Sequence, residues 1–98
     1  MFCVIYKFSV KSGQESEFCE VWHALTIMIR EHQGSLGSRL HVAGPNKFIA
    51  YAQWPSRTAW KAPSRMPPMG KDLSLRLKEC CESIEVLHEL DVVDDLLG

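Results

Sequence analysis

Hydrophobic and polar side chains alternate along residues 2–10 with the two-residue period of a β-strand. One face of this segment is apolar or aromatic throughout: Phe2, Val4, Tyr6, Phe8 and Val10. The segment is rich in the aromatic and β-branched residues that strands favour, and Ser12-Gly13 then breaks the pattern. We therefore predict a first strand at residues 2–10 whose apolar face packs on a core.

Between residues 14 and 32 the period changes to that of a helix. Apolar residues recur there at steps of three and four: Phe18, Val21, Trp22, Leu25, Met28 and Ile29. Glu15 and Glu17 lie in the first turns, where the helix dipole favours negative charge. Gly34 suits the left-handed residue that often ends a helix. These features predict an amphipathic helix over residues 14–32.

Two further strands are expected as a hairpin, followed by a short helix. Residues 36–43 and 47–54 alternate again, and residues 44–46 (Gly-Pro-Asn) have the composition of a turn. Pro55 cannot continue a central strand, and Ser56 is a good N-cap. The short helix that begins there has to end before Pro63.

The rest of the chain supplies one more helix and one more strand. Residues 63–70 are rich in proline and are expected to form an irregular loop. A helix is expected at residues 72–83, with one apolar face. That face consists of Leu73, Leu77, Cys80 and Ile84. Alternation over residues 84–92 predicts the last strand, and residues 93–98 form a tail.

The order strand, helix, strand, strand, helix, strand is that of the split βαβ, ferredoxin-like arrangement. The predicted fold class is therefore α+β: one antiparallel βαββαβ sheet with the helices on one face. At 98 residues the chain is expected to be a single domain, residues 1–98.

The sheet face away from the helices is predicted to mix apolar and polar side chains. The apolar ones are Cys3, Ile5, Ile49, Tyr51 and Leu87, and the polar ones are Lys7, Arg39, His41, Gln53 and Glu89. A face of this size is rarely left in water, so we expect a homodimer that packs sheet to sheet, giving a dimeric α/β barrel. The alternative is a monomer with a solvated sheet face.

Composition excludes several classes of partner. Eleven basic residues against twelve acidic ones provide no basic surface for nucleic acid. No apolar run is long enough to span a membrane, and the first residues lack the features of a secretory signal, so a cytoplasmic location is expected. The four cysteines have neither metal-ligand nor disulfide-framework spacing and are read as free thiols.

Residues 54–62 resemble a motif of the antibiotic biosynthesis monooxygenase (ABM) family, whose members are small dimeric α/β-barrel proteins. Its pattern is Trp, one residue, Ser, one residue, an acid, Ala, a bulky apolar residue, one residue, Ala and His. The residues that fit it are Trp54, Ser56, Ala59, Trp60 and Ala62. The similarity extends in outline over the chain: residues 11–13 after the first strand, 34–36 before the second, and the turn at 45–46. The resemblance implies the ferredoxin-like fold and a dimer.

Two departures bear on activity. Thr58 stands where the family usually has an acid, and Pro63 where many members have His. The haem-degrading branch uses an Asn, a Trp and a His, and the matching positions lie near Tyr6, Pro63 and Leu73, so haem degradation is disfavoured. Other members oxidise phenolic polyketides or quinols with oxygen and no cofactor. By this resemblance we expect no cofactor in this protein.

The resemblance places a pocket between the sheet and the helices. Even-numbered strand residues are expected to face it, namely Tyr6, Ser38, Ala50, Ala52 and His88. The last strand should pair with the first, so His88 and Tyr6 are predicted neighbours and the candidate catalytic pair. A His can take the proton of a phenol or enol, and the resulting anion reacts with oxygen. The alternative is a His satisfied by Tyr6 or by backbone at the edge of the core.

The candidate substrate-binding residues are Trp60, Ser38, Met66, Met69 and Trp22. Trp60 begins the short helix over the pocket, and the two methionines flank Pro67-Pro68, where flexible thioethers can mould to a flat aromatic ligand. They can equally pack on the core, as Trp22 can. No metal site is expected. The function expected is a cofactor-free monooxygenase acting on a phenol, quinol or polyketide-like aromatic, or a non-catalytic dimeric small-molecule-binding or stress-related protein of the same fold.

Overall fold

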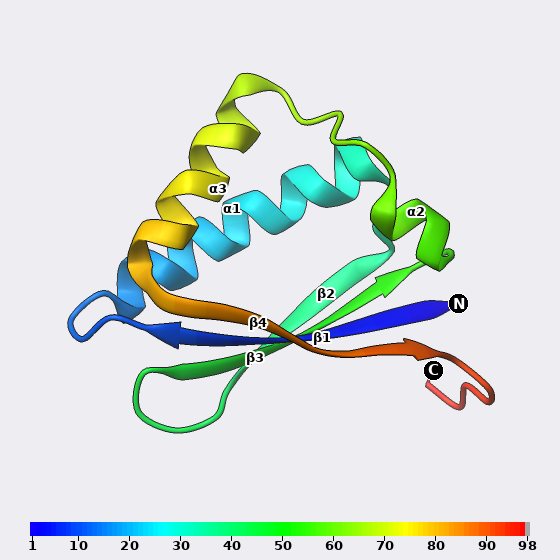
Figure 1. Cartoon of the computed structure of the whole chain (residues 1–98), viewed down its shortest axis with the longest axis horizontal. Coiled ribbons are helices and arrows are strands. Elements are labelled where there is room, and N and C mark those ends of the chain that lie inside the picture. Colours follow the sequence, from blue (N-terminus) through cyan, green and yellow to red (C-terminus); the bar gives the residue numbers. More distant parts are fainter. Residues whose placement is uncertain (98) are drawn as a thin grey trace.

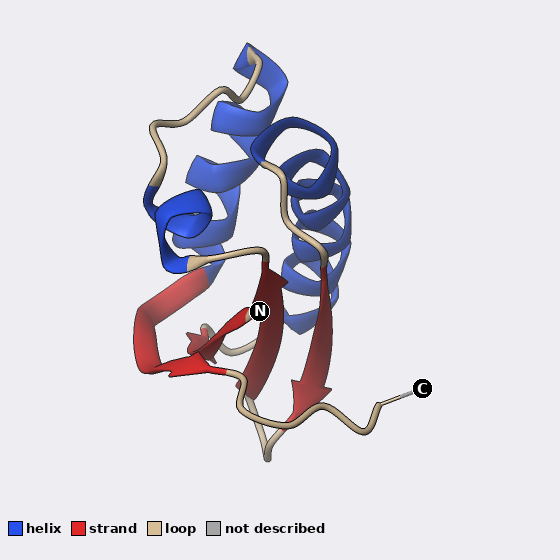
Figure 2. Cartoon of the chain, turned by 90° about the vertical axis from the view of Figure 1, so that its right-hand side faces the viewer, coloured by secondary structure: helices blue, strands red, loops and turns tan. Residues whose placement is uncertain are grey.

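The computed structural model describes residues 1–97 of the chain as a four-stranded antiparallel sheet under a layer of helices (Figure 1). The elements follow in the order β1 (Phe2–Val10), α1 (Glu15–Gln33), β2 (Gly37–Val42), β3 (Lys47–Trp54), α2 (Arg57–Lys61), α3 (Pro68–Cys80) and β4 (Cys81–Asp91). The strand order is β2-β3-β1-β4, and all three pairings are antiparallel. Figure 2 shows all helices on one side of the sheet. The predicted ferredoxin-like α+β fold is confirmed.

The core lies between the helices and the even-numbered residues of β1 and β3. At one end, Phe18 of α1 is fully buried between Phe8 and Phe48, with ring centroids 5.1 and 5.0 Å apart. At the other end a smaller cluster contains Phe2, Val4, Ala52 and Trp54. The alternation in the sequence therefore divides β1 and β3 into their two faces as expected.

The termini of the helices follow from local chemistry. Gly34 ends α1 with φ of 81°, the left-handed conformation that glycine adopts without strain. The Ser56 hydroxyl accepts a hydrogen bond from the Ala59 amide at 3.1 Å and caps α2. The predicted irregular loop over residues 63–70 is too long, because α3 already begins at Pro68. Proline fits the first turn of a helix, where its missing N–H has no partner to lose.

A β-bulge in β4 changes which of its side chains face the helices. Tyr6 pairs with Val86, but Ile5 pairs with His88, so Leu87 is an extra residue in this strand. Because paired residues of antiparallel strands share a face, His88 lies with Ile5 on the face away from the helices. Glu89 pairs with Val4 on the helix side. The prediction that His88 neighbours Tyr6 is therefore wrong, as is the placement of Glu89 on the open face.

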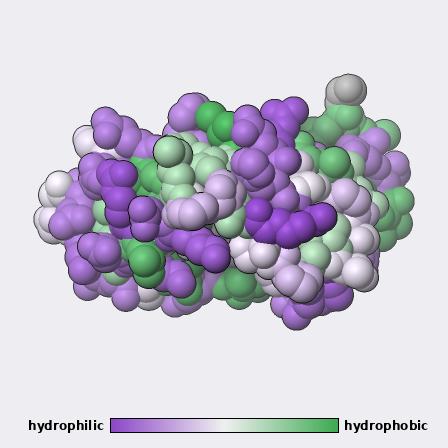
Figure 3. All heavy atoms as spheres, turned by 90° about the horizontal axis from the view of Figure 1, so that it is seen from above, coloured by the Kyte–Doolittle hydropathy of each residue, from purple (hydrophilic) through white to green (hydrophobic). Residues whose placement is uncertain are grey.

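The open face of the sheet is partly apolar. Arg39 and His41 lie there, as predicted, and pair with Tyr51 and Ile49 of β3. Residues 92–97 follow β4 and, with Cys3 and Tyr51, line a hollow at one end of this face. Several apolar side chains near it are exposed: Leu87 (40%), Leu90 (45%), Val93 (98%), Leu96 (90%) and Leu97 (68%). By contrast, hydrophilic residues predominate on the outer surface of the helix layer (Figure 3).

None of the helices within residues 1–97 is both long enough and apolar enough to cross a bilayer. In the same part of the chain, no three His, Cys, Asp or Glu side chains converge as a metal site would require.

Replacing Phe18 by Ala is expected to lower the free energy of unfolding by about 3–5 kcal/mol, since it leaves a cavity among three packed rings. Urea denaturation followed by circular dichroism measures this change. Ile27→Ala, on the exposed side of the same helix, is the control and should cost less than about 1 kcal/mol. Equal losses in the two variants would contradict this description of the core.

Candidate functional site

A cavity of about 210 Å³ lies between the sheet and the helices. Its floor consists of short side chains of β2 and β3, namely Ser38, Ala50 and Ala52, which leave space beneath the helices. Its walls are mainly apolar and aromatic, from Phe8, Trp22, Leu25, Ile29, Trp54, Leu77 and Ile84. A hollow of this composition suits an apolar, flat molecule.

A second cavity of about 280 Å³ adjoins the first. The two share the lining residues Leu25, Ile29, Trp54 and Ser74. Trp60 and Met66 line only the second. Met66 packs over the start of α3 because residue 70 is glycine, where a Cβ would lie 2.4 Å from the Met66 methyl carbon.

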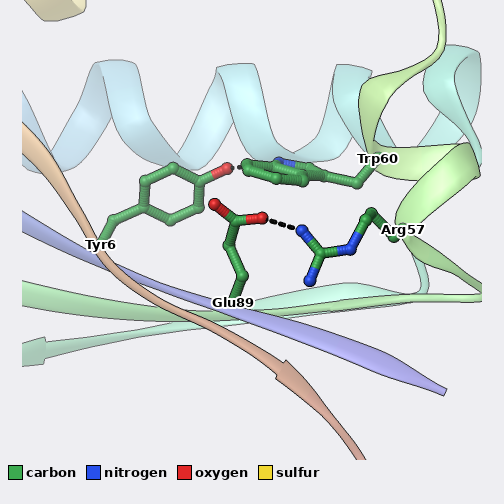
Figure 4. A network of polar contacts seen from close by, with 4 residues as sticks. All are labelled: Tyr6, Arg57, Trp60 and Glu89. Atoms are coloured by element: carbon green, nitrogen blue, oxygen red, sulfur yellow. Dashed lines mark hydrogen bonds and ion pairs between the residues drawn. The ribbon is translucent and has the colours of Figure 1, made fainter.

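Four polar side chains from three elements meet beside the first cavity (Figure 4). The Trp60 indole Nε1 donates a hydrogen bond to the Tyr6 hydroxyl oxygen at 2.8 Å. Arg57 forms an ion pair with Glu89 and lies over the Phe2 ring, 4.8 Å from its centroid. In Figure 4 the Glu89 carboxylate lies between the Tyr6 ring and the Arg57 guanidinium. The network joins β1, α2 and β4.

The Tyr6 hydroxyl stays protonated near neutral pH. Burial raises the pKa of Tyr6 above its ordinary value, and the charge of Glu89 raises it further, while the bond from Trp60 acts in the opposite direction. Because an indole N–H only donates, the Tyr6 oxygen is the acceptor in that bond and its own proton remains available. Tyr6 therefore presents a neutral hydrogen-bond donor at the cavity wall.

Other polar atoms around the cavity decide which hydrogen-bonding groups of a ligand the lining can pair with. The Ser38 hydroxyl donates to the Tyr51 carbonyl oxygen at 2.9 Å, so it has only lone pairs left for the cavity. The buried Trp54 Nε1 has no hydrogen-bond acceptor among the described residues, although the ring lines both cavities. Lys78 of α3 brings a positive charge to the lining. Trp54 and Lys78 favour a ligand that carries acceptor oxygens or a negative charge, whereas Ser38 can accept a hydrogen bond from a ligand hydroxyl.

The structure brings most of the predicted site residues to the helix side. Tyr6, Trp22 and Ser38 line the first cavity. Trp60 and Met66 line the second. Met69 lies apart from both, with 67% of its surface exposed. His88 is on the other face of the sheet, where the bulge places it.

Sequence reasoning missed Trp54, Lys78, Arg57 and Glu89. Trp54 shares the even-numbered face of its strand with Ala50 and Ala52, so the alternation contained the signal for it. Lys78 follows Leu77 on α3, and nothing in the helical pattern distinguishes it from a solvated lysine. Glu89 could be found only from the register of β4.

Comparisons with known proteins agree with this architecture. SnoaB, a cofactor-independent oxygenase from Streptomyces nogalater, has a similar structure with a TM-score of 0.78, 17% sequence identity, and coverage of 99% of this chain and 97% of that one. Rv0793 from Mycobacterium tuberculosis matches with a TM-score of 0.75 and 17% identity, over 98% of each chain. At these identities the likeness establishes the fold. No curated protein sequence gives a significant match.

The family comparison depends on the sequence itself. Residues 1–71 match the profile described as antibiotic biosynthesis monooxygenase. The matched segment runs from β1 into the start of α3 and includes both Tyr6 and the Trp54–Trp60 stretch. It covers well over half of the 98 residues, and the chain therefore belongs to the antibiotic biosynthesis monooxygenase family.

Proposed function

We propose that the protein binds a planar phenolic, quinol or polyketide-like aromatic on the helix side of its sheet and oxidises it with molecular oxygen, without a cofactor. The observation that carries this proposal is the apolar cavity of about 210 Å³ with the Tyr6 hydroxyl as a neutral donor in its wall. The second cavity shares four lining residues with the first, so a fused-ring ligand can extend from one to the other.

The chemistry requires little from the protein beyond stabilising an anion. An ionised phenol or enol is electron-rich and transfers electrons to oxygen. When a ring methylene becomes a carbonyl, one O₂ is consumed and one water is released, so the substrate supplies all the electrons. The donor at Tyr6 and the positive charge of Lys78 both favour the anionic form of a bound ligand over the neutral form.

A non-catalytic binding protein is the second candidate. It is favoured by the position of His88, which the register of β4 sets on the opposite face from the cavity. Among the side chains that line the first cavity, the ionisable ones are Tyr6 and Lys78, and burial raises the pKa of Tyr6. A protein of this kind would retain the ligand without turnover.

We further infer that two copies pack through their open sheet faces. The exposed apolar side chains of β4 and of residues 92–97 adjoin this face, and a second copy would remove them from water. The four cysteines are unpaired and three of them are buried, which fits a reducing, cytoplasmic setting.

Ser74→Leu is expected to weaken binding of 1,4-naphthoquinone at least about tenfold, because Ser74 lines both cavities and the larger side chain fills them. Quenching of tryptophan fluorescence measures the dissociation constant. Ser16→Leu makes the same change on the exposed side of α1 and should bind as wild type does. Unaltered affinity in Ser74→Leu would exclude the helix-side cavities as the binding site.

Oxygen consumption separates the two candidate functions. With dithranol, a hydroxyanthrone, an oxygenase consumes oxygen faster than the buffer alone and Ser74→Leu reduces that rate, because the substrate no longer enters. Wild-type protein that binds dithranol but leaves the rate at the buffer value is a binding protein and not an enzyme for this class.

Ile49→Arg is expected to convert a dimer into monomers, since it sets a charge in the middle of the open sheet face. Sedimentation velocity at micromolar concentration gives the mass. Ile27→Arg, on the outer surface of the helix layer, is the matched control and should remain dimeric. A monomeric wild-type protein under these conditions would refute the sheet-to-sheet assembly.

A further inference from the structure

We propose that Tyr6 and Glu89 form a proton route from the cavity to solvent: Tyr6 takes the hydroxyl proton of the bound phenol while passing its own proton, across one bridging water, to the Glu89 carboxylate. This inference rests on the proposed function, because it needs a phenol or enol in the cavity. It identifies the group that generates the reactive anion, a role that the displaced His88 cannot fill.

The first part of the route is the Tyr6 hydroxyl. A phenol oxygen has two lone pairs and one proton. Trp60 Nε1 occupies one lone pair at 2.8 Å, which fixes the orientation of the group. The second lone pair can accept a hydrogen bond from a ligand hydroxyl. The proton of Tyr6 can be donated to an acceptor. Tyr6 lines the cavity itself, so a ligand can reach it directly.

The second part is Glu89, which the bulge at Leu87 turns to the helix side of the sheet. Its carboxylate lies close enough for its charge to act on the Tyr6 phenol. Its side chain is 34% exposed, so a proton that it accepts can pass on to water. One group thus lies in the cavity wall, and the next is both beside it and in contact with solvent.

The charged groups around this pair come from two helices. Arg57 of α2 holds the Glu89 carboxylate in an ion pair, and Lys61 of α2 lies over the Trp60 ring, 5.3 Å from its centroid. Lys78 of α3 lines the cavity. Lys78 stabilises the negative charge that proton removal creates on the ligand, whereas Arg57 and Lys61 line neither cavity.

The transfer is balanced without a redox partner. The O–H bond of the ligand breaks as its proton moves to the Tyr6 oxygen, and the O–H bond of Tyr6 breaks as its proton moves to the bridging water, which gives one of its own protons to a Glu89 oxygen. The products are a ligand anion, a neutral Tyr6 that donates to that anion, and a protonated Glu89. Glu89 then releases its proton to water, which restores the starting state of the protein.

The test uses 2-naphthol, a fused-ring phenol whose anion absorbs at longer wavelength than the neutral form. Wild-type protein with bound 2-naphthol is mixed with alkaline buffer in a stopped-flow instrument, and the rate at which the bound ligand ionises is recorded. Glu89→Gln keeps the shape of the side chain but removes the base. We expect ionisation at least about tenfold slower, with the dissociation constant of neutral 2-naphthol within about threefold of wild type.

Three further variants separate proton acceptance from a structural role. Tyr6→Phe should slow ionisation as Glu89→Gln does, and the double variant should be no slower than either, because both residues serve one route. Arg57→Gln breaks the ion pair but retains the carboxylate, so the rate should stay within about threefold. His88→Gln alters the neighbouring residue on the opposite face and should behave as wild type.

Two results would overturn the route while leaving the binding function intact: ionisation in Glu89→Gln as fast as in wild type, or Arg57→Gln as slow as Glu89→Gln. The latter would show that the ion pair anchors α2 and that Glu89 is not a base. Failure of wild-type protein to bind 2-naphthol would refute the proposed function and the proton route together.

Discussion

The hydrogen bond from Trp60 to Tyr6 is the interaction on which the site depends. Helix α2 has five residues and no buried side chain, too little to be stable alone. The Ser56 cap stabilises the helix, and the bond to Tyr6 holds it against the sheet. The same bond fixes the direction in which the Tyr6 hydroxyl can act. One hydrogen bond thus both anchors α2 and orients the Tyr6 hydroxyl.

The helix side of the sheet forms a packed core at one end and a cavity further along. Where Phe8, Phe18 and Phe48 meet, rings from two strands and a helix fill the space completely. Further along the same face, Ala50 and Ala52 are too short to do so, and a cavity results. A packed core beside a hollow of similar lining explains how a small chain can be stable and still offer room for a ligand.

Simple periodicity in the sequence predicted the fold and the helix-facing residues of β1 to β3, because each of these segments keeps one period throughout. It placed Tyr6 and Ser38 correctly for the same reason. It failed in β4, since an extra residue leaves the alternation of letters unchanged while it reverses the face of everything beyond it. The start of α3 was missed because Pro68 looks like a breaker but occupies a position where proline is tolerated. Contacts such as Trp60 with Tyr6 join residues far apart in the chain and leave no periodic signal.

The bulge at Leu87 also means that the register of β4, and not only residue identity, decides which ionisable group reaches the site. In a regular ladder that kept every residue, Leu87 would pair with Ile5 and His88 with Val4, which would bring an imidazole, in place of a carboxylate, to the helix side of the sheet. Loss of the bulge would therefore exchange one kind of acid–base group for another with no substitution at either position. Relatives compared column by column at 17% identity can carry equivalent chemistry at positions that do not align.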